Sequence, residues 1–329
     1  MVKNLLVTEY MKEYFQDRGY NCVKPYNIVN NNDTVFVTAG IQPLLYEYRN
    51  LKFDNASKIY LSQPVIRTQF ASTVAEGYSI AFTNSTTCGF NISEENHNNL
   101  VKDWIELFCE LGMSRDCIFE KSKSYEREWG DLLVSGKKTF YYYNDLELGD
   151  TTFFTSITKN GDNIGIDTMS DVGFGLERIR WCISGQSYFD LYSDSSLLSP
   201  EVKANLSVVA LLAVNGVKPS NKNCGYRARM FSKRLAELLE GRSFSSLEEN
   251  YLMECVEYWK QWQEVTSDVD VSIIRNEYDR NCNRYIIEQL TNDGYQNLSG
   301  ININISKEEL GKRLICSNVE KEKVKKLIR

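Results

Sequence analysis

The sequence contains a single histidine, His97, among its 329 residues. Triads of the Ser-His-Asp type, Cys-His pairs and zinc sites built from several histidines are therefore nearly excluded. The nine cysteines include no Cys-X-X-Cys pair, so the close ligand pairs that are typical of thiolate metal sites are missing as well. Any chemistry must depend on arginines, carboxylates and backbone groups.

Long apolar runs are also absent: none approaches the roughly 20 residues that a membrane-spanning helix needs. Residues 1–20 interleave charged and apolar side chains, which is typical of an amphipathic helix and not of a signal peptide. We therefore expect a cytoplasmic protein whose cysteines are small buried side chains rather than disulfides. The net charge of −6 argues against broad nucleic-acid binding, although it leaves room for a local basic surface.

The chain changes character near residue 195. The earlier part combines helical patterns with strand patterns, and the later part contains helical patterns alone. We expect an α+β fold with two domains, one at 1–195 and an all-helical one at 196–329. The main predicted strands are 58–70, its antiparallel partner 79–92, 137–148, and 151–167 with a turn at Asn160-Gly161. The predicted helices are 4–18, 98–113, 175–184, 202–217, 226–241, 245–265 and 271–290.

The stretch "TMSDVGFGLERIRW", residues 168–181, combines a carboxylate, two glycines and an arginine. It is not the dinucleotide fingerprint, because Arg178 stands where the third glycine is required. A P-loop is missing too, since Asp131 replaces the first glycine before "GK". The pattern predicts a strand ending at Asp171 and a helix that carries Arg178 in its first turn. Arg178 can then bind phosphate oxygens or be an incidental surface arginine, and this segment alone leaves both open.

A second arginine follows the strand "KIYLSQPVI". Alternation puts Arg67 on the face opposite Ile66, and a loop and a returning strand with Phe82 come next. This order suits a bent ATP, with the guanidinium at the α-phosphate and the aromatic ring at the base. The alternative is a strand arginine in a surface ion pair, which is the commoner outcome for one arginine.

Together these motifs resemble those of class II aminoacyl-tRNA synthetases, and of the alanyl-tRNA synthetase family in particular. "DVGFGLERI" resembles the family's motif 3, and "DTVFVTAGIQPLLYEY" and "SQPVIRTQ" also resemble segments of its catalytic domain. "LLAVNGVKPSNKNCGYRARMFSKRL", residues 211–235, is similar to the start of the family's tRNA-recognition helices. The resemblance covers nearly the whole chain and stops where the family's editing and C-terminal domains begin. It implies a class II antiparallel sheet flanked by helices.

The resemblance also implies roles for single residues. Arg67 would bind the α-phosphate of ATP, Phe82 would stack on adenine, and Arg178 would bind the γ-phosphate. Asp171 matches the family aspartate that holds the α-ammonium of the substrate, and Gly173 belongs to the same amino-acid-binding turn. A capping role for Asp171 is disfavoured, because three residues separate it from the expected helix.

The segment "NDLELGD" supplies two further carboxylates. Glu147 or Asp150 is expected to bind Mg²⁺ between the phosphates. The sequence also departs from the family: Tyr78 lies near the place of a loop histidine, and the tryptophans of the family's amino-acid pocket have no counterpart. The identity of the amino acid therefore stays open.

In the helical part, the resemblance implies that Asn223 and Arg234 lie near a tRNA acceptor stem, and Arg227 belongs to the same segment. A local basic cluster supports this prediction, whereas a solvated helix face is the plain alternative. The cluster consists of Lys222, Arg227, Arg229, Lys233 and Arg234.

Three functions follow from these features. The first is a ligase that activates a small amino acid with ATP and Mg²⁺ and transfers it to a tRNA. The second keeps the adenylate chemistry but loads a carrier protein or a small molecule. The third is a non-catalytic paralogue that binds tRNA or another partner; it predicts loss of Arg67 or Arg178, and both are present. No membrane partner is expected.

Overall fold

A computed structural model gives the three-dimensional structure of the chain. It describes residues 2–29, 34–49, 57–74, 77–187, 197–263 and 268–328. Residue contacts divide the chain into two compact units, which we call the sheet unit and the helical unit. The boundary predicted between residues 195 and 196 lies outside the described residues. The sheet unit is Met1–Thr68 with Ala81–Leu191, and the helical unit is Gln69–Ile80 with Tyr192–Arg329.

One sheet runs through the sheet unit, and the described residues contribute eight strands to it. The order across the sheet is β1-β2-β3-β8-β6-β5-β4, and β7 pairs with β6. All pairings are antiparallel except that of β1 with β2. The expected antiparallel sheet is thus confirmed. The strands are β1 (Asn21–Cys22), β2 (Ile59–Ile66), β3 (Ala81–Phe90), β4 (Ile118–Trp129), β5 (Leu132–Tyr143), β6 (Leu146–Lys159), β7 (Asp162–Asn163) and β8 (Met169–Gly175).

Asparagines turn the chain at two connections between neighbouring strands. β2 and β3 pair as the sequence predicts, and Asn160 and Gly161, both with positive φ, turn the chain from β6 into β7. The expectation of one strand over 137–148 is wrong, because β5 ends at Tyr143 and β6 begins at Leu146. The cause is Asn144, whose φ of 51° lies in the left-handed region that asparagine tolerates.

The edge strand β4 was not predicted from the sequence. Its side chains are nearly all exposed and alternate lysine, serine and glutamate, so it lacks the apolar alternation by which a strand is recognised. Charged side chains on a long edge strand discourage pairing with another chain. The same property that hides β4 from pattern analysis therefore protects the edge of the sheet.

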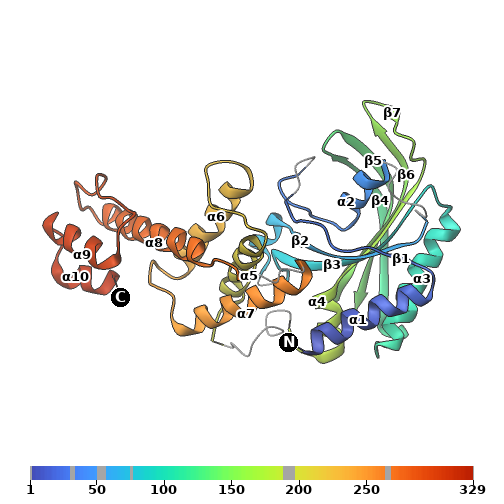
Figure 1. The fold of residues 1–329 in the computed structure, drawn as a ribbon, viewed down its shortest axis with the longest axis horizontal. Coiled ribbons are helices and arrows are strands. Elements are labelled where there is room, and N and C mark those ends of the chain that lie inside the picture. Colours follow the sequence, from blue (N-terminus) through green and yellow to red (C-terminus); the bar gives the residue numbers. More distant parts are fainter. Residues whose placement is uncertain are drawn as a thin grey trace. The chain divides into compact units, whose positions relative to one another are not determined.

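α1 (Val2–Asp17) and α3 (Glu94–Glu110) lie together along one face of the sheet (Figure 1). Trp104 and Phe108 of α3 each place their ring centres 4.9 Å from that of Phe174 on β8. Trp104 Nε1 also donates a hydrogen bond of 2.9 Å to Thr87 Oγ1 on β3. We call this surface of the sheet the α3 face; it is a packed aromatic core.

His97 belongs to the α3 face and not to a site. Its Nδ1 lies 2.7 Å from Ser170 Oγ, and its ring centre lies 5.3 Å from that of Phe153. Burial, helped by the charge of Lys137, lowers the pKa of His97 to about 4. The histidine is thus a neutral core side chain at physiological pH.

Part of the opposite face is covered by α2 (Ile41–Arg49) and an apolar cluster. The remainder carries the polar side chains of the candidate site. The buried members of the cluster are Ile41, Leu44, Leu45, Ile59, Leu61, Cys88, Phe90, Leu132, Val134, Phe154, Ile157, Ile166 and Met169.

The helical unit contains helices and, within its described residues, no strand, as the sequence predicts. Nearly every side chain of α5 is buried, whereas α6 buries one stripe. No helix in the described ranges combines the length and the apolar character that crossing a membrane requires. The helices are α5 (Pro200–Val214), α6 (Asn223–Leu238), α7 (Ser246–Gln263), α8 (Ser272–Asn292), α9 (Lys307–Cys316) and α10 (Lys321–Leu327).

Candidate active site

Strand pairing aligns polar side chains in rows on the face opposite α3, and we call this surface the site face. Because side chains alternate between the two faces of a sheet, residues directly opposite each other on neighbouring strands share a face. Asp171 and Asp150 therefore project from adjacent strands on the same side. The first row across β5, β6, β8 and β3 is Lys138, Thr152, Asp171 and Cys88, and the second is Phe140, Asp150, Gly173 and Thr86.

Asp171 is a partly buried carboxylate in the middle of the first row. Its Oδ1 accepts a hydrogen bond of 2.8 Å from Thr86 Oγ1. Burial and the neighbouring Asp150 raise the pKa of Asp171 to about 6, while the Thr86 hydrogen bond and the charges of Lys138 and Arg67 act in the opposite direction. A cation bound beside Asp171 would relieve this penalty, since it favours the ionised carboxylate.

Gly173 lies between Asp150 and Thr86, its direct neighbours in the second row. It has no side chain, and a Cβ built there would lie 3.0 Å from Asn84 Nδ2. The amide of Asn84 therefore occupies the space next to Gly173, and a larger residue at this position would displace it. The predicted amino-acid-binding residues, Asp171 and Gly173, are brought together here.

Arg67 directly follows the last residue of β2. Its Nε donates a hydrogen bond of 2.8 Å to the Thr38 carbonyl, and its guanidinium carbon lies 5.0 Å from the ring centre of Phe82. Burial lowers the pKa of Arg67, and the carboxylates of Asp150 and Asp171 act against that shift. The guanidinium stays charged, and the structure brings together the arginine and the aromatic ring that the sequence singled out.

Arg178 lies in the first turn of α4 (Leu176–Ser184), after Gly175. Its Nη1 donates a hydrogen bond of 2.5 Å to the Glu147 carbonyl and lies 3.8 Å from Glu147 Oε1. The buried Glu177 accepts hydrogen bonds of 2.9 and 3.0 Å from the Thr83 amide, which ties the same turn to β3. Arg178 is only 14% exposed, so it is not an incidental surface arginine.

A bulge in β6 places Glu147 and Asp150 on one face although three positions separate them. Tyr141 pairs with Gly149, but Tyr142 pairs with Glu147, so Leu148 has no residue opposite it on β5. The extra residue shifts the alternation by one. Without the bulge, Glu147 would point into the α3 face.

Sequence analysis missed Lys138, which belongs to the first row. Its Nζ lies 2.7 Å from Asp150 Oδ1 and 4.8 Å from the ring centre of Tyr125. No motif contains Lys138, and only the register of β5 against β6 and β8 shows that it faces the site.

Sequence analysis also assigned no site residue to the segment before α2. The Gly40 amide donates a hydrogen bond of 2.9 Å to Asn84 Oδ1, and the Thr38 carbonyl accepts from Arg67. A Cβ at Gly40 would lie 2.3 Å from Thr86 Cγ2, so only glycine allows the chain to pass this close. The resemblance of "VTAG" to a family segment was the available signal.

The two predicted Mg²⁺ ligands are both paired with cations in this structure. Asp150 binds Lys138, and Glu147 lies beside Arg178. The described residues contain no group of three or more His, Cys, Asp or Glu side chains that would hold a metal by themselves. Hard carboxylate oxygens nevertheless suit Mg²⁺, which usually takes one or two of them together with phosphate oxygens. The carboxylates of Glu147 and Asp150 therefore fit an Mg²⁺ ion that is shared with the phosphates.

On α6, the three residues predicted to contact tRNA share one side of the helix. Asn223, Arg227 and Arg234 are spaced by four and seven positions, so they lie within about 40° of each other at the helical period of 3.6 residues. Asn223 and Arg234 are exposed, and Arg234 Nη1 lies 3.5 Å from Glu237 Oε2. The buried stripe of α6 is formed by Gly225, Ala228, Phe231, Ser232, Leu235 and Ala236.

The rest of the predicted basic cluster is partly neutralised. Arg229 Nε lies 3.0 Å from Glu277 Oε1, and Lys233 Nζ lies 3.7 Å from Glu237 Oε1. The local positive charge of α6 is therefore weaker than the sequence suggests.

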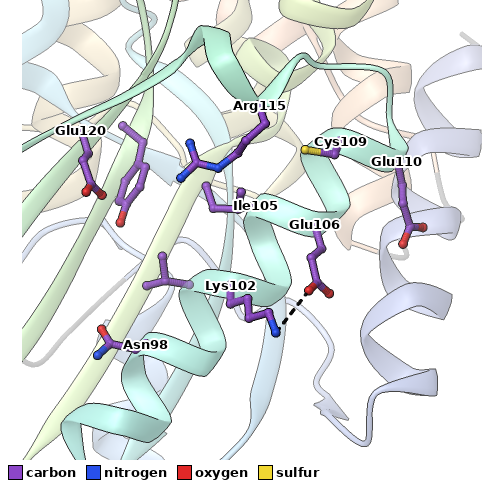
Figure 2. A pocket seen from close by; sticks show the side chains of 10 residues that line it. Asn98, Lys102, Ile105, Glu106, Cys109, Glu110, Arg115 and Glu120 are labelled. Carbon is purple, nitrogen blue, oxygen red and sulfur yellow. Dashed lines mark ion pairs between the residues drawn. The ribbon is translucent and has the colours of Figure 1, made fainter.

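Figure 2 shows a pocket of about 610 Å³ that is separate from these residues. Lys102, Ile105 and Glu106 of α3 line one side, and the paired Glu120 and Tyr141 of β4 and β5 line the other. Tyr141 packs on Phe174, with ring centres 5.8 Å apart. The pocket therefore belongs to the α3 side of the sheet and contains no predicted site residue.

No protein-family model and no curated protein sequence matches the chain. Among solved structures, it is similar to PylSc of Desulfitobacterium hafniense, a pyrrolysyl tRNA synthetase. The sequence identity is 16%, the match covers 56% of this chain and 67% of the other, and the TM-score is 0.40.

Proposed function

We propose that the chain activates a small amino acid with ATP and transfers the aminoacyl group to the end of a tRNA. One observation carries this proposal: strand register and the first turn of α4 bring Arg67, Asp171 and Arg178 together on the site face. A carboxylate between two arginines suits a substrate that has a cationic end and an anionic end. An amino acid beside ATP meets both requirements.

The amino acid would bind through its α-ammonium. Asp171 supplies the charge partner, and Gly173 follows two positions later on the same face of β8. The raised pKa of Asp171 supports this role, because a bound cation favours the ionised form of a carboxylate whose pKa burial has raised. The amino-acid carboxylate then points toward Arg67.

ATP would bind in a bent form between the two arginines. Arg67 would hold the α-phosphate, Phe82 would stack on adenine, and Arg178 would hold the γ-phosphate, because a guanidinium fork matches phosphate oxygens. The amino-acid carboxylate attacks the α-phosphorus, the bond to the β-phosphate oxygen breaks, and pyrophosphate leaves. The protein acts by orientation and by charge stabilisation, without a histidine and without a covalent enzyme intermediate.

Glu147 is the better placed of the two candidate Mg²⁺ ligands. Its carboxylate lies beside Arg178, where the terminal phosphates would bind, whereas Asp150 lies in the row of Gly173. The ion would supply charge neutralisation at the departing pyrophosphate.

The acceptor is proposed to be tRNA because Asn223, Arg227 and Arg234 share one side of α6. An amide reads a groove edge and guanidinium groups meet phosphates. A carrier protein or a small molecule is the alternative acceptor.

The proposal is tested by pyrophosphate exchange into ATP, measured with each common amino acid in turn. We expect exchange with one small amino acid, and charging of total cellular tRNA with that same amino acid. Exchange without charging at any salt concentration would move the acceptor to a carrier protein or a small molecule. Absence of exchange with every amino acid would leave only the non-catalytic binding function.

A further inference from the structure

The candidate site contains an ion pair that the proposed chemistry does not use. Lys138 Nζ and Asp150 Oδ1 are 2.7 Å apart, and the two side chains are only 17% and 22% exposed. Burying such a pair removes hydration from two charges and adds little to stability compared with apolar side chains of the same volume. A partly buried pair on the same face as Asp171 therefore indicates a role in recognition.

The pair has hydrogen-bonding capacity left over. Within the described part of the chain, each of the two side chains has only the other as a hydrogen-bond partner. Lys138 thus retains two N–H donors, and Asp150 retains Oδ2 as an acceptor. Donor and acceptor lie side by side, and Asp150 is directly opposite Gly173 on the neighbouring strand.

The next row of the sheet limits the length of a substrate side chain. Phe154, Met169 and Phe90 follow Thr152, Asp171 and Cys88 on the site face, and all three are buried in the apolar cluster under α2. A substrate side chain that extends from Asp171 in that direction meets a filled core. Only a short one can remain beside Lys138 and Asp150.

The charge of the pair restricts the chemistry further. Because Lys138 and Asp150 neutralise each other, an anionic side chain would be repelled by Asp150 and a cationic one by Lys138. An apolar methyl group would leave the leftover donor and acceptor without water and without partners. A neutral group that both donates and accepts hydrogen bonds satisfies both.

We propose that Lys138 and Asp150 select the amino acid substrate, and that it carries a short hydroxyl or carboxamide side chain rather than the methyl group of alanine. The inference rests on the proposed function, since it places the α-ammonium at Asp171. Lys138 donates to the side-chain oxygen, and Asp150 accepts from its O–H or N–H. Sites built to bind such groups reject analogues that lack them.

The test uses non-hydrolysable aminoacyl-adenylate analogues, which require neither Mg²⁺ nor turnover. Calorimetry on the full chain compares alanyl-, seryl- and asparaginyl-sulfamoyl adenosine. We expect the seryl or the asparaginyl analogue to bind about 100-fold more tightly than the alanyl analogue. The comparison within the unmodified chain is decisive by itself and requires no variant.

A charge-neutral double variant sharpens the result. Lys138→Met with Asp150→Val replaces the pair by apolar side chains, and the preference should invert in favour of the alanyl analogue. Lys102→Met with Glu106→Val is the matched control, because Lys102 Nζ and Glu106 Oε1 also form an ion pair, 3.7 Å apart, but both lie on α3, away from the site face. Its preference should equal that of the unmodified chain.

The possible failures are distinguishable. Tighter binding of the alanyl analogue to the unmodified chain, or the same preference in the folded double variant, would overturn the role of the pair and leave adenylate formation standing. If the unmodified chain binds none of the analogues and exchanges pyrophosphate with no amino acid, the proposed function is wrong and the inference falls with it.

Discussion

The charged side chains of the candidate site and those of α6 are held in different ways. Arg178 is 14% exposed and donates to the carbonyl of Glu147 on β6, and Arg67 donates to the carbonyl of Thr38 in the segment before α2. Arg234 on α6 is 53% exposed and is paired with Glu237 on the next turn of its own helix. The first kind of charge is fixed before a ligand arrives, and the second kind can move toward it.

The shielded charges of the site and the exposed charges of α6 suit two different functions. Charges that are fixed and shielded from water stabilise a transition state, because they need no reorganisation as charge develops. Exposed charges attract phosphates from solution and are screened by salt. Burial also shifts pKa values, as at Asp171 and His97, so the sheet unit should respond to pH and α6 to ionic strength.

The largest expected effect is that of Arg178→Ala. It removes a shielded guanidinium from the phosphate site, so kcat/KM for pyrophosphate exchange should fall by about 10² to 10³, or about 3 to 4 kcal/mol. Arg18→Ala is the control, because Arg18 forms ion pairs with Asp103 and Glu110 of α3, outside the site face. Full exchange activity in Arg178→Ala would remove Arg178 from the site.

The second effect concerns stability in acid. The folded-state pKa of His97, about 4, is below its unfolded value, so the unfolded chain binds a proton that the folded chain does not as the pH falls below 6.5. The His97 contribution to the free energy of unfolding is lost over this window, by about 3 kcal/mol. His97→Asn, measured by urea denaturation, should become more stable relative to the unmodified chain between pH 6.5 and 4. Equal pH dependence of the two proteins would contradict the buried, neutral state.

The effect of Asp171→Asn on stability should have the opposite pH dependence to that of His97→Asn and should be somewhat smaller. The folded-state pKa of Asp171, about 6, is above its unfolded value, so the ionised carboxylate destabilises the free protein above pH 6 and this cost disappears as the pH falls. At pH 7.5 the variant should be more stable than the unmodified chain by about 1 to 3 kcal/mol, with no gain at pH 4. It should also lose amino-acid binding far more than ATP binding, as calorimetry would show. Equal losses for both ligands would indicate a structural role.

The smallest effect is expected for Arg234→Ala. Loss of one phosphate contact should reduce the slope of log K for tRNA against log salt by about 1. Pyrophosphate exchange should be unchanged in Arg234→Ala, because adenylate formation involves residues of the sheet unit. Arg313→Ala is the matched control, since Arg313 of α9 is also 53% exposed and pairs with Glu309 one turn away. An unchanged slope in Arg234→Ala would take α6 out of the tRNA interface.

Much of the fold could be predicted because its signals are local. Helical spacing identified α3 and α5 to α8, and alternation together with an Asn-Gly turn identified β2, β3 and β6. The edge strand β4 could not be found, because its exposed face and its charged residues remove the alternation. The turn at Asn144 was overlooked within an aromatic run that continues the strand pattern on both sides.

The residues of the candidate site also fall into two groups, those that local sequence identifies and those that only strand pairing reveals. Arg67, Asp171 and Arg178 stand in segments whose residue order is itself informative. Lys138 stands in no such segment, and its relation to Asp150 depends on pairing between strands.

Local patterns in the sequence identified most of the long helices and several of the strands, and the arginines, the carboxylate and the glycines stand in recognisable segments. These features depend on neighbours in the chain, so they can be read without coordinates. The tertiary structure decided which of these side chains meet. The bulge at Leu148 turns Glu147 onto the site face, register joins Lys138 to Asp150, and burial raises the pKa of Asp171. Each of these results from packing between strands that are distant in sequence, and no local pattern encodes it.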